Sequence, residues 1–226
     1  MQKYTTIARW YDALSAEPVY GAGRRRAVPA LGLRTGDRVL DVGCGTGLNL
    51  PLLSAAVGAR GLVVGVDMSA EMLGVARAKA TSSRRTEARF VEADATRLTP
   101  DDLQAAGLER HELFDAAIFT YSLSLMSDPD GAWRAVRTLL RPGAGVGVVD
   151  MQPPTGTAAV LTPLARLACR VAGSDITARP WLTVEADLTD VRRWTLRGGH
   201  IQVSVGRLAA GREGWRAAAG LPDRSH

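Results

Sequence analysis

The fold of this chain is decided by one stretch, Arg38-Val39-Leu40-Asp41-Val42-Gly43-Cys44-Gly45-Thr46-Gly47. It predicts a buried strand that ends in a glycine-rich turn, because β-branched residues and leucine precede three glycines at alternate positions. Glycine has no Cβ, so the backbone of such a turn bends sharply and comes close to a ligand. The apolar residues that follow predict a helix over about 49–57, whose first N–H groups face the turn. A strand, loop and helix of this kind hold an anionic or polar ligand against peptide N–H donors.

The spacing of the glycines separates two classes of nucleotide-binding loop. A dinucleotide fingerprint, G-x-G-x-x-G, would need a third glycine at residue 48 or 50, and both positions hold leucine. The chain instead has D-x-G-x-G-x-G, with Asp41 two residues before Gly43. In this form it resembles the first motif of the class I S-adenosylmethionine-dependent methyltransferases. The resemblance covers roughly the first two thirds of the chain by motif, and the remainder more loosely.

Two more aspartates follow predicted strands. Asp67 ends the apolar run 61–66, where a carboxylate suits both hydroxyls of a ribose held over the first loop. The alternative is an N-cap for the next helix, and we favour ribose binding because Ser69 caps that helix at least as well. The resemblance implies that Asp94 accepts a hydrogen bond from an adenine amino group, and that the N–H of Ala95 serves the adjacent ring nitrogen. An aspartate that caps a turn is the alternative for Asp94.

The resemblance implies S-adenosylmethionine as the cofactor. Asp41 would lie on the side of the methionyl ammonium, and the backbone carbonyl of Thr120, after the strand 114–119, would accept from that ammonium. We expect Cys44 to be a small residue that a tight loop tolerates rather than a nucleophile, and we expect no metal site. The cofactor-binding residues expected on this basis are Asp41, Gly43, Cys44, Gly45, Gly47, Asp67, Met68, Asp94, Ala95, Thr120 and Tyr121.

The alternation of strands and helices, together with the resemblance, predicts an α/β fold. We expect a Rossmann-like, seven-stranded, mostly parallel sheet with an antiparallel last strand and helices on both faces. Five regions follow: an N-terminal helical cap (1–36), a cofactor-binding core (37–151), an insertion that caps the substrate (152–190), terminal strands that complete the sheet (191–210) and a tail (211–226). The expected elements include helices over 4–14, 23–30 and 129–140, a strand over 146–151 and a hairpin turn at Gly198-Gly199.

The acceptor side is less well defined. By resemblance, Tyr11 and Tyr20 line the substrate pocket, and Tyr121 faces either cofactor or substrate. The alternatives for the N-terminal helices are that their aromatic face packs on the core, or that they lie on a membrane surface with the arginines at 24–26 as an anchor. These three tyrosines are the candidate catalytic residues. We expect His111 at the wrong end of the sheet for chemistry, and His200 as a residue near a turn or on the surface.

We expect methyl transfer to a small molecule. A hydroxyl acceptor would need a base and none is evident, which favours an amine or an acidic carbon, and of these we favour the amine. Short matches at Tyr11-Asp12, Tyr20-Gly21 and 121–124 also resemble phospholipid N-methyltransferases and quinone-biosynthesis C-methyltransferases, so a lipid amine or a quinone-like carbon is the alternative acceptor. Two other classes compete. A NAD-type oxidoreductase lacks the third glycine, and the intact motifs disfavour a non-catalytic cofactor-binding subunit.

Composition narrows the classes further. The 226 residues suit one α/β domain, and a net charge of +5 without an aromatic-interleaved basic stripe argues against a nucleic-acid partner. Two cysteines, Cys44 and Cys169, suggest no disulfide framework and fit a reducing cytoplasm. The N-terminus has no apolar signal core, and no stretch reaches the ~20 apolar residues of a membrane span. Peripheral contact with a membrane is therefore expected only if the acceptor is a lipid.

Overall fold

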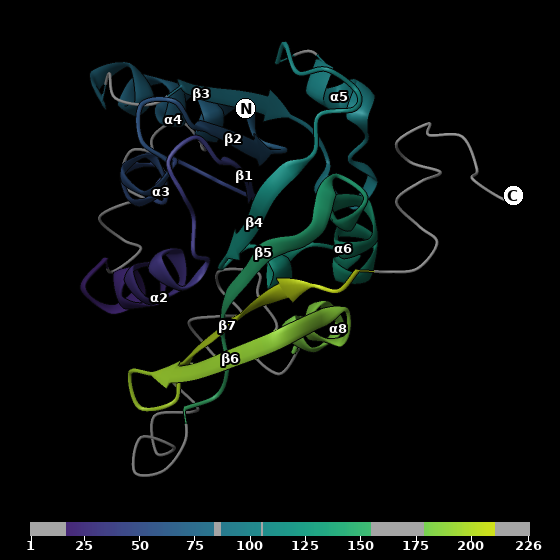
Figure 1. Ribbon diagram of the computed structural model, residues 1–226. Coiled ribbons are helices and arrows are strands. Elements are labelled where there is room, and N and C mark those ends of the chain that lie inside the picture. Colours follow the sequence, from purple (N-terminus) through teal and green to yellow (C-terminus); the bar gives the residue numbers. More distant parts are fainter. Residues whose placement is uncertain (1–16, 84–86, 105, 155–178, 211–226) are drawn as a thin grey trace, which may run out of the picture.

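The computed structural model of the chain describes residues 17–83, 87–104, 106–154 and 179–210 (Figure 1). The predicted helix over 4–14, Tyr11, Cys169, the greater part of the 152–190 insertion and the 211–226 tail lie outside the described residues. None of the helices in the described ranges combines the length and apolar character needed to cross a membrane.

The structure is built on a seven-stranded sheet with the order β3-β2-β1-β4-β5-β7-β6 (Figure 1). The first five strands run parallel, whereas β7 is antiparallel to both of its neighbours, so the predicted fold class is confirmed. Chain order reverses between β1 and β4, and ligands of open α/β sheets bind outside the carboxyl ends of the strands at such a point. The strands are β1 (Arg38–Val42), β2 (Leu62–Asp67), β3 (Glu87–Glu92), β4 (Phe114–Thr120), β5 (Leu140–Met151), β6 (Leu188–Leu196) and β7 (Ile201–Leu208).

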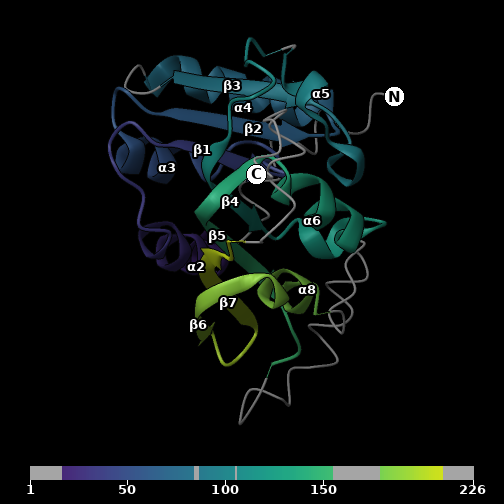
Figure 2. The ribbon, with the colours of Figure 1, turned by 45° about the vertical axis from the view of Figure 1, so that its right-hand side comes forward.

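Helices cover both faces of the sheet, as both ribbon views show (Figures 1 and 2). One face carries α2 (Glu17–Ala30), α3 (Leu50–Val57) and α4 (Ala70–Ser83), and the other carries α5 (Pro100–Gln104), α6 (Pro129–Arg137) and α8 (Trp181–Ala186). Two single turns of 3₁₀ helix, η1 (Ala95–Arg97) and η2 (Leu123–Leu125), follow β3 and β4.

The two apolar cores follow from the period of two along the strands. On β1, Val39 packs with α2 and α3, whereas Leu40 and Val42 pack with α6. All three are fully buried, because a central parallel strand has helices on both sides. Asp41 shares the α3 side with Val39, and this alternation directs a carboxylate into an otherwise apolar layer.

Three element boundaries differ from those predicted. Helix α2 begins at Glu17 rather than at 23, because Pro18 falls in the first turn, where a proline is tolerated. Helix α6 ends at Arg137 and β5 already begins at Leu140, so the predicted helix over 129–140 is too long. The Arg-Pro-Gly segment that resembles a helix stop lies inside β5, where Gly143 has a φ of 78° and the register shifts.

The carboxyl end of the predicted 152–190 insertion is regular structure. Helix α8 packs Trp181 and Val184 into the core beside α6, and β6 begins at Leu188, inside the predicted range. The hairpin turn between β6 and β7 forms at Gly198-Gly199, whose φ values are 65° and 82°.

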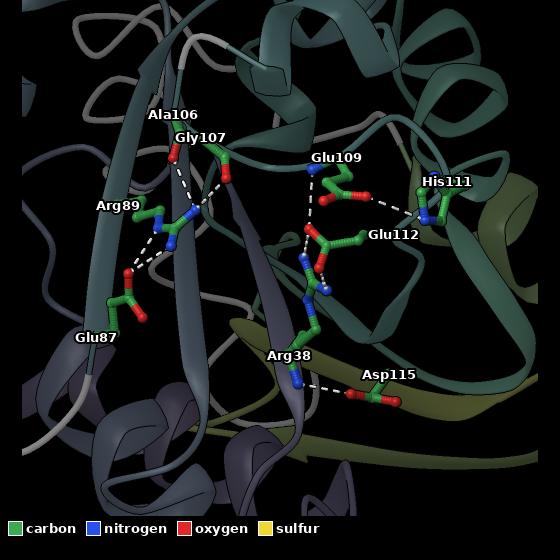
Figure 3. Close-up of polar contacts among 9 residues, drawn as sticks. All are labelled: Arg38, Glu87, Arg89, Ala106, Gly107, Glu109, His111, Glu112 and Asp115. Atoms are coloured by element: carbon green, nitrogen blue, oxygen red, sulfur yellow. Dashed lines mark hydrogen bonds and ion pairs between the residues drawn. The ribbon is translucent and has the colours of Figure 1, made fainter.

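Ion pairs gather at the amino-terminal edge of the sheet (Figure 3). The Arg38 guanidinium lies 2.6 and 2.7 Å from the two carboxylate oxygens of Glu112, and it lowers the pKa of Glu112 to about 2. The backbone N–H of Arg38 donates to Asp115 at 2.6 Å. His111 lies at this edge, 3.2 Å from Glu109, which confirms its predicted position away from the glycine loop.

Candidate functional site

The glycine loop after β1 is tied to the end of β2. Gly43, Gly45 and Gly47 have φ values of 67°, 54° and 78°, a region that L side chains rarely adopt. The N–H groups of Gly43 and Cys44 both donate to the carbonyl of Val66, at 2.8 and 3.0 Å. These hydrogen bonds hold the loop against the end of β2, and the loop then leads into α3.

The three glycines have different surroundings. A Cβ on Gly43 would lie 2.4 Å from the Cβ of Ser122, and a Cβ on Gly47 would lie 3.2 Å from that of Ala76. A Cβ on Gly45 would meet nothing within 4 Å. Gly43 and Gly47 therefore allow the loop to pack closely on the protein, whereas Gly45 borders open space that a bound ligand can fill.

Asp67 lies directly beside Gly45. Its Oδ2 accepts the N–H of Gly45 at 2.8 Å, and its Oδ1 accepts the N–H of Ser69 at 3.0 Å. The cap of α4 is Ser69, whose hydroxyl accepts the N–H of Met72 at 3.3 Å. Asp67 does not cap that helix, and a carboxylate oxygen that accepts one hydrogen bond retains capacity for a hydroxyl donor.

Asp41 is buried on β1 and is held by an amide that the sequence analysis missed. The Nδ2 of Asn49 donates both to Asp41 Oδ1 and to Thr120 Oγ1, each at 2.7 Å. Burial raises the pKa of Asp41 to about 7, although the Asn49 hydrogen bond and the charge of Arg24 lower it. The only sign of Asn49 in the sequence is a single amide within the apolar run 48–53.

The carbonyl oxygen of Asn49 completes this group. It is buried and has no hydrogen-bond partner within the part of the chain that the structure describes. A buried acceptor without a donor is costly, so a donor supplied by a ligand stabilises it. Asp41, Asn49 and the end of β4 at Thr120 thus form an acceptor-rich group whose chemistry fits an ammonium.

Asp94 follows β3, next to Asp67 in the order of the strands. Its Oδ1 accepts the N–H and the hydroxyl of Thr96, at 2.9 and 2.7 Å, and so caps η1. These hydrogen bonds hold the pKa of Asp94 below its usual range. The structure therefore gives Asp94 the turn-capping role that was the alternative, and its predicted contact with adenine stays a prediction, as does that of Ala95.

Two further cofactor-site predictions concern exposure. Met68 is 77% exposed beside Asp67, where its side chain is open to a planar ligand. Cys44 is buried, and its Sγ occupies the space that a Cβ on Gly65 would enter at 2.8 Å. Burial, reinforced by Asp41 and Asp67, raises the pKa of the Cys44 thiol, so it stays protonated and is no nucleophile.

The segment after β4 reaches across the sheet to α2. Tyr121 has a φ of 55°, a strained value for an aromatic residue, and its N–H donates to Val149 at 2.7 Å. Its hydroxyl donates to the carbonyl of Tyr20 at 2.7 Å, and the two rings meet edge to face with centroids 5.1 Å apart. Met151 packs against both rings, so Tyr20 and Tyr121 lie together at the ends of β4 and β5.

The same segment is anchored by a buried carboxylate that the sequence analysis missed. Asp150 accepts the N–H and the hydroxyl of Ser124 at 3.0 and 2.7 Å, and the N–H of Met151 at 2.8 Å. Burial raises the pKa of Asp150, whereas these hydrogen bonds lower it. Asp150 thereby ties η2 to β5 and fixes the chain that carries Tyr121.

His200 lies beside Tyr20. Its Nδ1 lies 2.8 Å from the carbonyl oxygen of Gln152, and its Nε2 lies 3.5 Å from the hydroxyl of Tyr20. His200 is half-buried beside β7, and because β7 runs antiparallel, the start of that strand lies at the carboxyl edge of the others. It is near a turn, as predicted, but the sequence analysis missed its place at this edge.

Comparisons with known proteins agree with the fold and the loop. Residues 39–143 match the family model described as a methyltransferase domain. The chain is 36% identical over 157 residues to a 2-phytyl-1,4-naphtoquinone methyltransferase of Synechococcus elongatus, covering 67% of this chain and 63% of that protein. It is also 36% identical over 156 residues to a demethylmenaquinone methyltransferase of Thermus thermophilus, covering 67% of this chain and 65% of that protein. The chain thus spans less than two thirds of the length of these relatives.

The solved structures agree on the fold. A crystal structure of a SAM-dependent methyltransferase from Aquifex aeolicus superimposes with a TM-score of 0.61 at 18% identity, covering 91% of this chain and 98% of that one. Residues 39–143 carry a methyltransferase domain, and the fold of the chain is that of the class I S-adenosylmethionine-dependent methyltransferases. S-adenosylmethionine is the cofactor of that class, and two features fit it: the open space at Gly45, and the oxygen of Asn49 that has no partner among the described residues.

Proposed function

We propose that the protein transfers a methyl group from S-adenosylmethionine to a ring carbon of a small, hydroxylated aromatic acceptor of the quinone type. One observation supports methyl transfer: Asp41, Asp67 and the open face of Gly45 lie together at one edge of the sheet, in a chain whose residues 39–143 match a methyltransferase domain. The quinone-type acceptor rests on the relatives named above, whose printed names are those of naphthoquinone and menaquinone methyltransferases.

Different residues are proposed to bind different parts of the cofactor. The bound cofactor supplies a methyl group on a sulfonium, which is open to in-line displacement. Asp67 accepts the ribose hydroxyls, while Asp41 and the oxygen of Asn49 accept the methionyl ammonium together with the carbonyl of Thr120. Asp94 and Ala95 recognise the adenine, and the Asp94 oxygens retain acceptor capacity beside the hydrogen bonds to Thr96.

The proposed acceptor, a ring carbon, differs from the amine that the sequence favours. An amine is favoured above because no base is evident, whereas the structure brings a histidine and two tyrosines together at the ends of β4 and β5. A ring carbon becomes nucleophilic when a hydroxyl on the same ring loses its proton, so a base at this position supports carbon methylation. The amine acceptor remains the competing hypothesis.

One labelling experiment separates the two acceptors. The purified protein is incubated with methyl-labelled S-adenosylmethionine and either 1,4-naphthohydroquinone or a panel of primary and secondary amines, including phosphatidylethanolamine vesicles. We expect label in the ring, identified by mass spectrometry as a carbon-bound methyl group. Label in amines alone would refute the quinone-type acceptor but retain methyl transfer. No label in any acceptor, with intact binding of S-adenosylhomocysteine, would favour the non-catalytic subunit.

Other features of the proposal follow from the sequence. We infer a cytoplasmic enzyme from the cysteine content, with a small-molecule substrate and no nucleic-acid partner. The 1–36 and 152–190 regions are proposed to close over the acceptor. Peripheral contact with a membrane is proposed only for an acceptor that carries a lipid chain.

A further inference from the structure

We propose that the hydroxyl of Tyr20 takes a proton from an acidic hydroxyl on the acceptor, and that His200 positions Tyr20 and receives the proton behind it. This inference rests on the proposed function and specifies the acceptor as a phenol, hydroquinone or enol. In this proposal Tyr20 is the catalytic residue, because its hydroxyl meets the acceptor, and His200 acts through it.

The hydrogen bonds of His200 determine its tautomer. Nδ1 lies 2.8 Å from the carbonyl oxygen of Gln152, and a carbonyl oxygen only accepts, so the ring proton sits on Nδ1. In the neutral imidazole the other nitrogen then carries a lone pair, and that nitrogen points to the Tyr20 hydroxyl at 3.5 Å. Catalytic hydrogen bonds are often long before the substrate binds and shorten in the complex.

Both partners of this contact are held in place. Gln152, which follows β5, is held beside the start of β7: its N–H donates to the carbonyl of His200 at 2.9 Å, and its side-chain amide donates to the carbonyl of Gly199 at 2.8 Å. The backbone of Tyr20 is fixed by the Tyr121 hydroxyl at 2.7 Å. These contacts hold the His200 ring and the backbone of Tyr20 in place before an acceptor binds, which favours proton transfer between them.

The close approach of α2 to Tyr121 depends on a glycine. A Cβ on Gly23 would lie 2.5 Å from the Tyr121 hydroxyl and 2.4 Å from Val149 Cγ1. Tyr121 also keeps a left-handed backbone to reach this position. Strain and a required glycine at the same contact indicate that the chain maintains the tyrosine pair at a cost in stability.

The proton and electron balance is complete without another reagent. The acceptor hydroxyl gives its proton to Tyr20 Oη as Tyr20 gives its own proton to His200 Nε2, leaving a phenolate and an imidazolium. An electron pair of the ring carbon forms the new carbon–carbon bond to the methyl group, and the broken carbon–sulfur pair stays on sulfur. The ring then loses its carbon-bound proton to solvent as the oxygen is reprotonated by the imidazolium, so one proton is released in each turnover.

The tautomer and the contact are tested without turnover. In protein labelled with ¹⁵N-histidine, we expect the His200 signals of an Nδ1–H tautomer, identified by their loss in His200→Gln. Tyr20→Phe should shift the Nε2 resonance, whereas His111→Gln, at the opposite edge of the sheet, should leave it unchanged. An Nε2–H tautomer, or no response to Tyr20→Phe, would overturn the proposal.

The proton transfer is tested with 4-nitrophenol as a probe in the presence of S-adenosylhomocysteine. We expect the wild-type protein and His111→Gln to bind the probe as its coloured phenolate at a pH where free probe is largely protonated. Tyr20→Phe and His200→Gln should bind it in the protonated form, because glutamine keeps a hydrogen-bond partner for Tyr20 but takes no proton. Equal phenolate in His200→Gln and wild type, or none in wild type, would contradict the relay.

Kinetics with 1,4-naphthohydroquinone separate this inference from the proposed function. His200→Gln should lower kcat about a hundredfold, the lower range for general acid–base groups, and leave KM and the affinity for S-adenosylhomocysteine within about threefold. If wild type methylates the ring and His200→Gln retains its kcat, the relay is refuted and the function stands. If wild type does not methylate the ring, the proposed function fails, and the two binding measurements still decide the relay.

Discussion

Asn49 donates to Asp41 at 2.7 Å and leaves its own carbonyl oxygen buried without a partner among the described residues. The amide therefore orients the carboxylate of the first motif and also presents a second acceptor beside it. A ligand that brings an ammonium group to this position satisfies both oxygens at once.

Replacing Asn49 by leucine tests this pairing. The variant keeps the side-chain volume but leaves Asp41 buried without its donor, which should lower the free energy of unfolding by about 1–3 kcal/mol. The affinity for S-adenosylhomocysteine should fall at least tenfold, measured by calorimetry, because an acceptor for the ammonium is lost. Thr138→Val, which removes an exposed hydroxyl from the end of α6, is the control and should bind the ligand as wild type does. Unchanged affinity in Asn49→Leu would exclude Asn49 from the cofactor site.

Cofactor binding should depend on pH through Asp41. Its pKa is about 7 in the free protein, and an ammonium at this site favours the carboxylate, so protons leave on binding. Affinity for S-adenosylhomocysteine should rise from about pH 5 to about pH 7, below the range where an α-amino group loses its proton, and then level off. Asp41→Asn should bind weakly with little pH dependence, whereas Asp101→Asn on exposed α5 should keep the wild-type curve. A flat wild-type curve would count against this role.

The same shift affects the stability of the free protein. The folded pKa of Asp41 lies above the ordinary value of 3.8, so between about pH 4 and 7 the folded state holds a proton that the unfolded chain has released. Stability contributed at this site should therefore decrease as pH rises through that window. The free energy of unfolding of wild type and of Asp41→Asn is measured in urea at pH 4 and at pH 7. From the lower to the higher pH, wild type should lose stability relative to the variant.

Two glycine variants separate packing from ligand space. Gly43→Ala should destabilise the protein strongly, because the new Cβ would meet Ser122 at 2.4 Å and φ is positive. Gly45→Ala should cost only about 1–2 kcal/mol of backbone strain, since nothing lies within 4 Å. Its affinity for S-adenosylhomocysteine should nevertheless fall by more than tenfold, because the methyl group enters the ligand space. If Gly45→Ala binds as wild type does, the open space is not the cofactor site.

The amino edge of the sheet should contribute acid sensitivity. The folded pKa of Glu112 is about 2, below its ordinary value of 4.5, so its contribution to stability is present above about pH 4.5 and is lost as pH falls toward 2. Urea unfolding should show Glu112→Gln to be less stable than wild type at pH 7, with the gap closing as pH falls through this window. Glu92→Gln, an exposed substitution at the end of β3, should show no such convergence.

The sequence alone determined the sheet, the glycine loop and the class of the protein, because each depends on local patterns. Alternating apolar runs specify buried strands, and a glycine is needed wherever φ is positive, so Asp41, Gly43 and Asp67 could be placed at strand ends before any coordinates. Boundaries were less well predicted where a local signal has two structural meanings. Arg141-Pro142-Gly143 has the composition of a helix stop but forms an irregular part of β5, because Leu140 before it and Gly145 after it both pair with β4.

Tertiary structure alone decided which distant side chains meet. Tyr20 and His200 are separated by 180 positions, and they come together only because β7 runs antiparallel and α2 crosses the ends of β4 and β5. Asn49 likewise acquires its role from Thr120, a neighbour across the sheet. Residue patterns encode period and turn chemistry over a few positions, whereas contacts between remote elements depend on the packing of the whole chain, which is why the candidate base emerged only from the fold.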